Sequence, residues 1–159
     1  MNITNLVQNL RDQYKDIYSL YTQVHQTYIN QQQAFQDDNE DQVQTIIDQR
    51  DKLIEQANPI NNQIAEIRNK ICQELNIKEF NLPYIKTINY LLTEDLEILT
   101  EKIRTQLRET INLDAELTAQ MQKALGENRQ KRQGLQQGKK VYQAYNQGQA
   151  HAMFIDKQK

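Results

Sequence analysis

The feature that most constrains the fold is a repeat of apolar residues at three- and four-residue steps between Thr93 and Tyr145. This spacing returns to one side of an α-helix every turn or two, and the stretch contains no proline, so it predicts one long amphipathic helix. A single helix cannot bury such a stripe alone, and the preceding chain must supply helices that pack against it. The stripe consists of Leu96, Leu99, Ile103, Leu107, Thr110, Leu113, Leu117, Met121 and Ala124.

Two earlier segments, about 4–35 and 41–75, have the same alternation of three- and four-residue steps, which is a heptad pattern. Polar residues occupy two positions in these stripes. Gln31 fills the only gap in the first stripe, and Arg50 takes an inward position in the second. A buried arginine needs a carboxylate or carbonyl partner; otherwise its long stem carries the charge to the surface. Four tyrosines along the first stripe favour core packing, with a ligand groove as the alternative.

Two interruptions shape the first two helices. The acidic residues 37–41 end the first helix and begin the second, with Asp38 or Asn39 as the N-cap. This run lacks the glycine and the spaced ligands of an EF-hand, so we expect a tight helical turn without a metal ion. Pro59 lies inside the second pattern and removes one backbone donor, which predicts a kink or a short break near Asn58.

The segment from Asn76 to Tyr84 is the largest interruption and carries four large apolar residues together with Pro83. We interpret it as a hydrophobic plug that caps one end of the bundle. A short helix could follow Pro83, and Thr93 with the acids after it is the predicted N-cap of the long helix. The sequence leaves open whether residues 83–92 form a separate helix or continue into the long one.

Composition bounds the class of protein. A chain of 159 residues with 38% hydrophobic residues fits one elongated helical domain better than a sphere. The net charge of −2 creates no field that would attract nucleic acid or an anionic membrane. One cysteine, Cys72, excludes an internal disulfide and fits a reducing cytosol. Neither a signal peptide nor a membrane span is recognisable, so we expect a soluble, cytoplasmic protein.

Catalytic and cofactor motifs are missing from the sequence. The two histidines, His25 and His151, lie far apart, and no HExxH, CxxC, phosphate loop, GxSxG or dinucleotide motif occurs. We therefore expect no enzyme, no metal and no cofactor. A basic run at 129–132, continued by Lys139 and Lys140, is interpreted as a solvated helix face. Contact with an acidic protein and nucleic-acid binding are the alternatives for that run.

The last third of the chain differs from the rest. Beyond Ala124 the apolar stripe thins, three glycines each destabilise a helix by about 1 kcal/mol relative to alanine, and only Leu135 is apolar between Gly126 and Lys140. We therefore divide the chain into a helical bundle core, 1–125, and an extended C-terminal helix with a tail, 126–159. The expected fold is all-α: an elongated antiparallel three-helix bundle or coiled-coil hairpin with a long C-terminal helix and a flexible tail.

Three pieces of this layout resemble the bacterial flagellar export chaperones of the FlgN/FliT class. They are the acidic turn with the second helix (38–53), the region 128–135, and the ending 139–145 followed by 154–157. The resemblance implies a small cytoplasmic helical chaperone for flagellar type III protein export. It implies that the C-terminal region binds the terminal helices of a hook–filament junction or filament-cap protein and presents that protein to the export apparatus.

These implications give the predicted protein-binding residues. An under-filled helical stripe can accept a client's amphipathic helix, and large apolar side chains can anchor it. The predicted binding residues are Asn128, Leu135, Val141, Tyr142, Tyr145, Met153, Phe154 and Ile155. The alternative function is a structural coiled-coil protein whose exposed stripes form a homodimer in a larger assembly.

Overall fold

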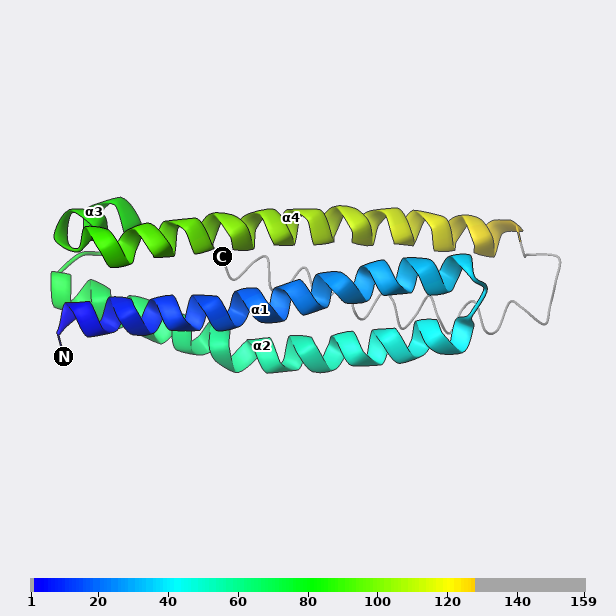
Figure 1. The fold of residues 1–159 in the computed structure, drawn as a ribbon, viewed down its shortest axis with the longest axis horizontal. Helices are drawn as coiled ribbons and strands as arrows, with labels where there is room; N and C mark the ends of the chain where they lie inside the picture. The colour runs from blue at the N-terminus through cyan, green and yellow to red at the C-terminus, as the bar shows by residue number, and fades with distance from the viewer. Residues whose placement is uncertain (1, 128–159) are drawn as a thin grey trace. The chain divides into compact units, whose positions relative to one another are not determined.

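The computed structural model describes residues 2–127, and within them the fold is all-α. Three long helices, α1 (Ile3–Gln36), α2 (Glu40–Leu75) and α4 (Tyr90–Glu127), are accompanied by the short helix α3 (Leu82–Ile88). The bounds of α1 and α2 agree with the predicted bounds to within one residue. The chain reverses direction between α1 and α2, and α4 runs in the same direction as α1 (Figure 1). The prediction of antiparallel packed helices is therefore confirmed.

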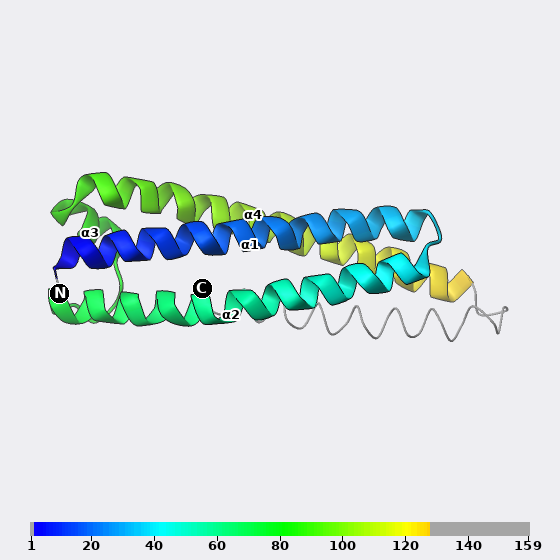
Figure 2. The ribbon, with the colours of Figure 1, turned by 60° about the horizontal axis from the view of Figure 1, so that its bottom comes forward.

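The helices contribute to two compact units. Unit 1 comprises Met1–Tyr21 and Gln56–Thr105, and unit 2 comprises Thr22–Glu55 and Gln106–Lys159, of which the described part ends at Glu127. Each unit packs one part of α1 with one part of α2 and one part of α4, and α3 belongs to unit 1. Figure 2 shows the same helices from a second direction.

The turn between α1 and α2 is closed by backbone hydrogen bonds. Asp38 has a φ of 54°, in the left-handed region. The Asp38 N–H donates to Phe35 O (3.2 Å) and the Asn39 N–H donates to Ala34 O (2.9 Å), the pattern of a Schellman motif. Asn39 Oδ1 then accepts from the backbone N–H of Gln42 at 3.2 Å. The predicted N-cap is therefore confirmed at Asn39.

Of the two outcomes predicted near Asn58, the short break is wrong and the kink stays a prediction. The helix α2 continues through Pro59 without interruption from Glu40 to Leu75. Proline removes only one helical hydrogen bond, and the apolar pattern continues on both sides of it, with Ala57 and Ile64 both buried. Packing of this face outweighs the lost backbone bond.

The region before the long helix forms a separate helix. Asn81 caps α3, because its Oδ1 accepts from the backbone N–H of Tyr84 at 3.0 Å. Asn89 is the C-cap of α3, with its backbone N–H donating to the Ile85 carbonyl oxygen, and α4 begins at Tyr90. The predicted N-cap at Thr93 is therefore wrong. Thr93 lies fully buried one turn inside α4, and its backbone N–H and its hydroxyl both donate to the Asn89 carbonyl oxygen.

The predicted hydrophobic plug is only partly confirmed. Phe80 is half-buried, with the Arg68 guanidinium 4.6 Å from its ring centroid. Tyr84, however, is 46% exposed, whereas Ile85 is fully buried. The short helix α3 turns Ile85 toward the core and Tyr84 toward solvent, because neighbouring residues of a helix point about 100° apart.

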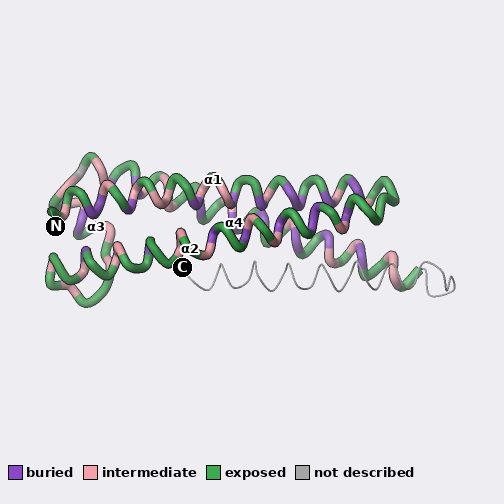
Figure 3. The backbone as a smooth tube through the Cα atoms, turned by 90° about the horizontal axis from the view of Figure 1, so that it is seen from below, coloured by how far each residue is buried: buried purple, intermediate pink, exposed green. Residues whose placement is uncertain are grey.

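Buried residues recur along one side of each long helix, as Figure 3 shows. The α4 stripe is confirmed at six of its nine predicted positions. The clearest difference lies at the middle of the stripe, where Asp114 is buried and its neighbour Leu113 is only half-buried. The buried positions that confirm the stripe are Leu96, Ile103, Leu107, Thr110, Leu117 and Met121.

Candidate functional site

The predicted client-binding residues lie outside the described part of the chain. This holds for Asn128, Leu135, Val141, Tyr142, Tyr145, Met153, Phe154 and Ile155. The end of α4, which leads into that segment, is described as far as Glu127.

Burial decreases along the last turns of α4. Leu117 and Met121 are buried, Ala124 and Leu125 are half-buried, and Gly126 is exposed. A Cβ atom added at Gly126 would meet nothing within 4 Å, so packing within the molecule does not require a glycine there. Met121 is therefore the last fully buried position of the stripe in the described part of the chain.

Unit 2 contains a cluster of buried polar groups at the middle of its core, here called the polar layer. Its members come from all three long helices and are at most 7% exposed. The polar layer consists of Thr27, Tyr28, Gln31, Arg50 and Asp114.

Arg50 on α2 is held by side chains of α1. Its Nε donates to Thr27 Oγ1 at 2.9 Å, and its Nη2 donates to Gln31 Oε1. The guanidinium also lies over the Tyr28 ring, 3.4 Å from the centroid, in a cation–π contact. The predicted carbonyl partner of the inward arginine is thus the Gln31 amide. The two polar residues that stood out in the first two stripes bind each other.

The helix α4 completes the polar layer. Gln31 Nε2 lies 3.9 Å from Met121 Sδ. Burial raises the pKa of the Tyr28 hydroxyl; the adjacent Arg50 opposes this shift, and the Asp114 carboxylate adds to it. The Tyr28 ring therefore lies directly against Arg50, the positive group of the layer.

His25 forms a structural contact in unit 2. Its Nδ1 lies 2.9 Å from Thr110 Oγ1, and the Thr110 hydroxyl donates its own hydrogen to the Gln106 carbonyl oxygen at 2.7 Å. Because that hydrogen is already used, the histidine nitrogen must be the donor. This arrangement does not activate a threonine nucleophile, for which the histidine would have to accept the hydroxyl hydrogen.

In unit 1 two tyrosines of α1 are shielded from water. The Asn61 amide donates to the Tyr21 hydroxyl oxygen at 3.0 Å. Burial raises the pKa of Tyr21 to about 12. Burial also raises the pKa of Tyr14, and the charges of Arg68 and Arg104 oppose that shift. Since these rings fill the seam, the structure supports core packing over a ligand groove.

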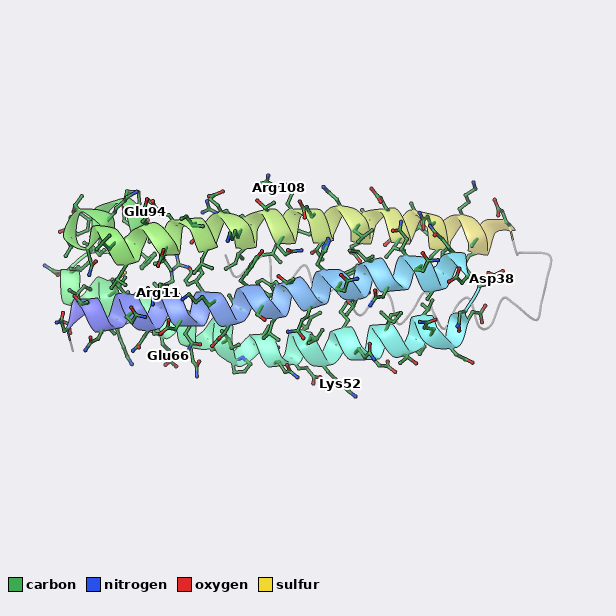
Figure 4. All side chains as sticks on the ribbon, viewed as in Figure 1. Arg11, Asp38, Lys52, Glu66, Glu94 and Arg108 are labelled. Carbon is green, nitrogen blue, oxygen red and sulfur yellow. The ribbon has the colours of Figure 1, made fainter. Side chains whose placement is uncertain are left out.

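The exposed apolar side chains of unit 1 lie on α3 and on the first turns of α4, in what we call the apolar patch: Tyr84, Ile88, Leu91 and Ile98. Leu91 is 78% exposed, and Ile98 follows seven residues later on the same side of α4. Glu94 on the same helix points away from α1 (Figure 4). The neighbouring sides of α4 are occupied by ion pairs, Arg11–Asp95 at 3.2 Å and Lys86–Glu97 at 2.6 Å.

Residues 2–127 contain no group of three or more His, Cys, Asp or Glu side chains placed to hold a metal ion. Within the same part of the chain, every helix falls short of the length or the apolar character needed to cross a membrane.

Sequence reasoning missed Asp114 and the apolar patch. Asp114 stands next to Leu113, and both positions fit a three- or four-residue step from Thr110, so the apolar neighbour was the natural choice. Leu91 and Ile98 share a seven-residue spacing, which was the available signal for the patch.

Comparison of the chain with protein-family models, with curated proteins and with solved structures finds no match.

Proposed function

We propose that the protein is a cytoplasmic chaperone of flagellar type III export. It holds the terminal helices of a hook–filament junction or filament-cap protein before secretion and presents that protein to the export apparatus. The proposal starts from the resemblance of the sequence to the FlgN/FliT class. The segment proposed to bind the client is 126–155.

The observation that carries the proposal is the decrease in burial at the end of α4. Most stripe positions up to Met121 are buried, whereas Ala124 and Leu125 after it are both half-buried. Apolar residues nevertheless continue in the sequence at Leu135 and Val141. An apolar stripe that other helices of the same protein leave uncovered can bind an amphipathic helix of another protein.

The chemistry of the segment suits this role. Tyr142 and Tyr145 supply large, stiff side chains of the kind that dominate binding energy at protein interfaces. Glycines at 126, 134 and 138 lower the intrinsic helix stability by about 1 kcal/mol each, which keeps the binding segment exchangeable. A chaperone that must release its client before export needs such a segment.

The test replaces both tyrosines, Tyr142→Ala and Tyr145→Ala, in the full chain. Two anchors of about 2 kcal/mol each correspond to an affinity loss of roughly 1,000-fold. Isothermal titration against purified hook–filament junction and filament-cap proteins measures this loss. Circular dichroism should show the same helix content and unfolding transition as the parent, because residues 2–127 are untouched.

Tyr84→Ala is the matched control, since Tyr84 is an exposed tyrosine outside the proposed segment. It should bind the same client with the parental affinity. Parental affinity in the variant lacking Tyr142 and Tyr145 contradicts the proposed site, and failure of the parent to bind any flagellar client contradicts the proposed function.

The apolar patch favours a second function, structural assembly through a coiled-coil homodimer. Leu91 and Ile98 form a heptad-spaced pair on the outward side of α4, as a dimerising helix requires. Under this alternative the parent sediments as a dimer, and Leu91→Gln with Ile98→Gln converts it to a monomer. Under the chaperone proposal the substitutions leave the sedimentation coefficient unchanged. Sedimentation velocity at several protein concentrations separates the two functions.

A further inference from the structure

We infer that the polar layer fixes the axial register of the three helices of unit 2. The layer brings together one polar stripe residue from each long helix: Gln31 from α1, Arg50 from α2 and Asp114 from α4. The inference is independent of the proposed function, because it concerns how the helices choose their own pairing.

Apolar packing alone leaves the register ambiguous. The stripes repeat every seven residues, so a shift by one heptad again places apolar residues opposite one another. Apart from Asp38 in the turn after α1, the residues one heptad away from the polar ones are apolar and at most 9% exposed: Val24 on α1, Val43 and Ala57 on α2, and Leu107 and Met121 on α4.

The polar layer removes this ambiguity. Seven residues correspond to about 10 Å along a helix. After such a shift of α1, Arg50 would lie beside Val24 in place of Gln31 and would lose the Thr27 hydroxyl and the Gln31 carbonyl that accept its N–H groups. A buried guanidinium without acceptors is strongly unfavourable, so shifted registers are excluded.

The effect is greatest for α4. The turn at 37–39, with its Schellman bonds and its Asn39 cap, already restricts how α2 can slide along α1. Within unit 2, α4 is joined to neither helix by a turn. A shift of α4 by one heptad would separate Met121 from Gln31 and move the buried Asp114 to the level where apolar Leu107 or Met121 now lies. The contact of Gln31 Nε2 with Met121 Sδ (3.9 Å), together with the burial of Asp114, therefore selects the position of α4.

The test uses an all-apolar layer: Gln31→Leu, Arg50→Leu and Asp114→Leu together. Spin labels at Asn30 and Glu116, both exposed, report the position of α4 along α1, with Cys72→Ser removing the native thiol. Because His25 Nδ1 contacts Thr110 Oγ1 at 2.9 Å and the two helices run in the same direction, these labels lie at nearly the same level in the native register. In the protein with the native polar layer, pulsed electron spin resonance should give one narrow distance between the two labels.

The apolar-layer variant should stay helical but give a second, longer distance population, from molecules in which α4 is shifted by about 10 Å. A control that keeps the polar layer and repacks its neighbours, Val24→Ile with Val43→Ile and Leu107→Met, should keep one distance. A single parental distance in the apolar-layer variant overturns the inference. Should that variant not fold, Gln31→Leu with Arg50→Leu is measured in the same way. If neither variant folds, the inference is also overturned, because the layer would then be needed for folding itself.

Discussion

Replacing Arg50 with alanine should lower the free energy of unfolding by about 3–5 kcal/mol, the range for removing one partner of a buried charged group. The substitution removes the donors to Thr27 Oγ1 and Gln31 Oε1 and the cation over the Tyr28 ring. It also opens a cavity where a fully buried side chain stood. Urea unfolding followed by circular dichroism measures the change.

Two variants separate the role of Arg50 from a general effect of losing a positive charge. Arg108→Ala removes an exposed arginine from α4 in the same unit, on the side that points away from α1 (Figure 4), and should change stability by less than about 0.5 kcal/mol. Arg50→Lys keeps the charge but cannot reproduce the planar fork that donates to two acceptors, so its loss should be intermediate. A loss below about 1 kcal/mol for Arg50→Ala contradicts the buried geometry.

Only part of the polar layer could be predicted from the sequence. The heptad pattern was sufficient to place Gln31 and Arg50 on inward sides of their helices, because side-chain direction follows from periodicity alone. It could not pair them, since the pattern fixes the face of a helix but leaves its axial register free. The burial of Asp114 could not be predicted for a second reason. Leu113 fits the same stripe equally well, and only three-dimensional packing decides between adjacent positions.

Helix ends were predictable where local chemistry dominates. The Asn39 cap follows an acidic turn whose signal is contained in five residues, and it is confirmed. The start of α4 was misplaced at Thr93, because Asn89 and Thr93 are both plausible caps and tertiary burial of Thr93 decides the outcome. The continuity of α2 through Pro59 has a similar cause, since packing on either side outweighs one lost bond.

The candidate client-binding site was predicted on different grounds. The predicted residues of 128–155 came from the resemblance and from the thinning of the stripe. The described residues bear on them only through the opening of the stripe after Met121. The apolar patch, by contrast, required coordinates, because a Leu or Ile within a helical pattern is first assigned to the core. Leu91 shows that this assignment can fail, because its side chain is 78% exposed.

The second large effect expected is a loss of stability in alkali that begins near pH 10. Burial raises the pKa of Tyr21 to about 12 and also raises those of Tyr14 and Tyr28. In the unfolded chain a tyrosine has a pKa of about 10. The unfolded state therefore releases its phenolic protons first, which favours unfolding as the pH rises above about 10. Below that pH the contribution of these tyrosines to stability is fully present.

For Tyr21 alone, the two-unit difference corresponds to about 3 kcal/mol, lost progressively between pH 10 and about pH 12. Urea midpoints measured from pH 8 to pH 11 should therefore be level at first and then fall. Tyr21→Phe gives up the hydrogen bond from Asn61 and should begin about 1 kcal/mol lower at pH 8. Its midpoint should then fall less steeply above pH 10, because no phenol at position 21 remains to ionise.

Tyr84→Phe is the matched control for the alkaline experiment. It removes a phenol that is 46% exposed, which water reaches in both the folded and the unfolded state, so the fall above pH 10 should match that of the parent. Lysines titrate in the same range, but both variants retain all of them, and their contribution cancels in the comparison. Parallel curves for the parent and Tyr21→Phe through pH 11 would mean that Tyr21 is hydrated in the folded protein. Its placement in the seam of unit 1 would then be wrong.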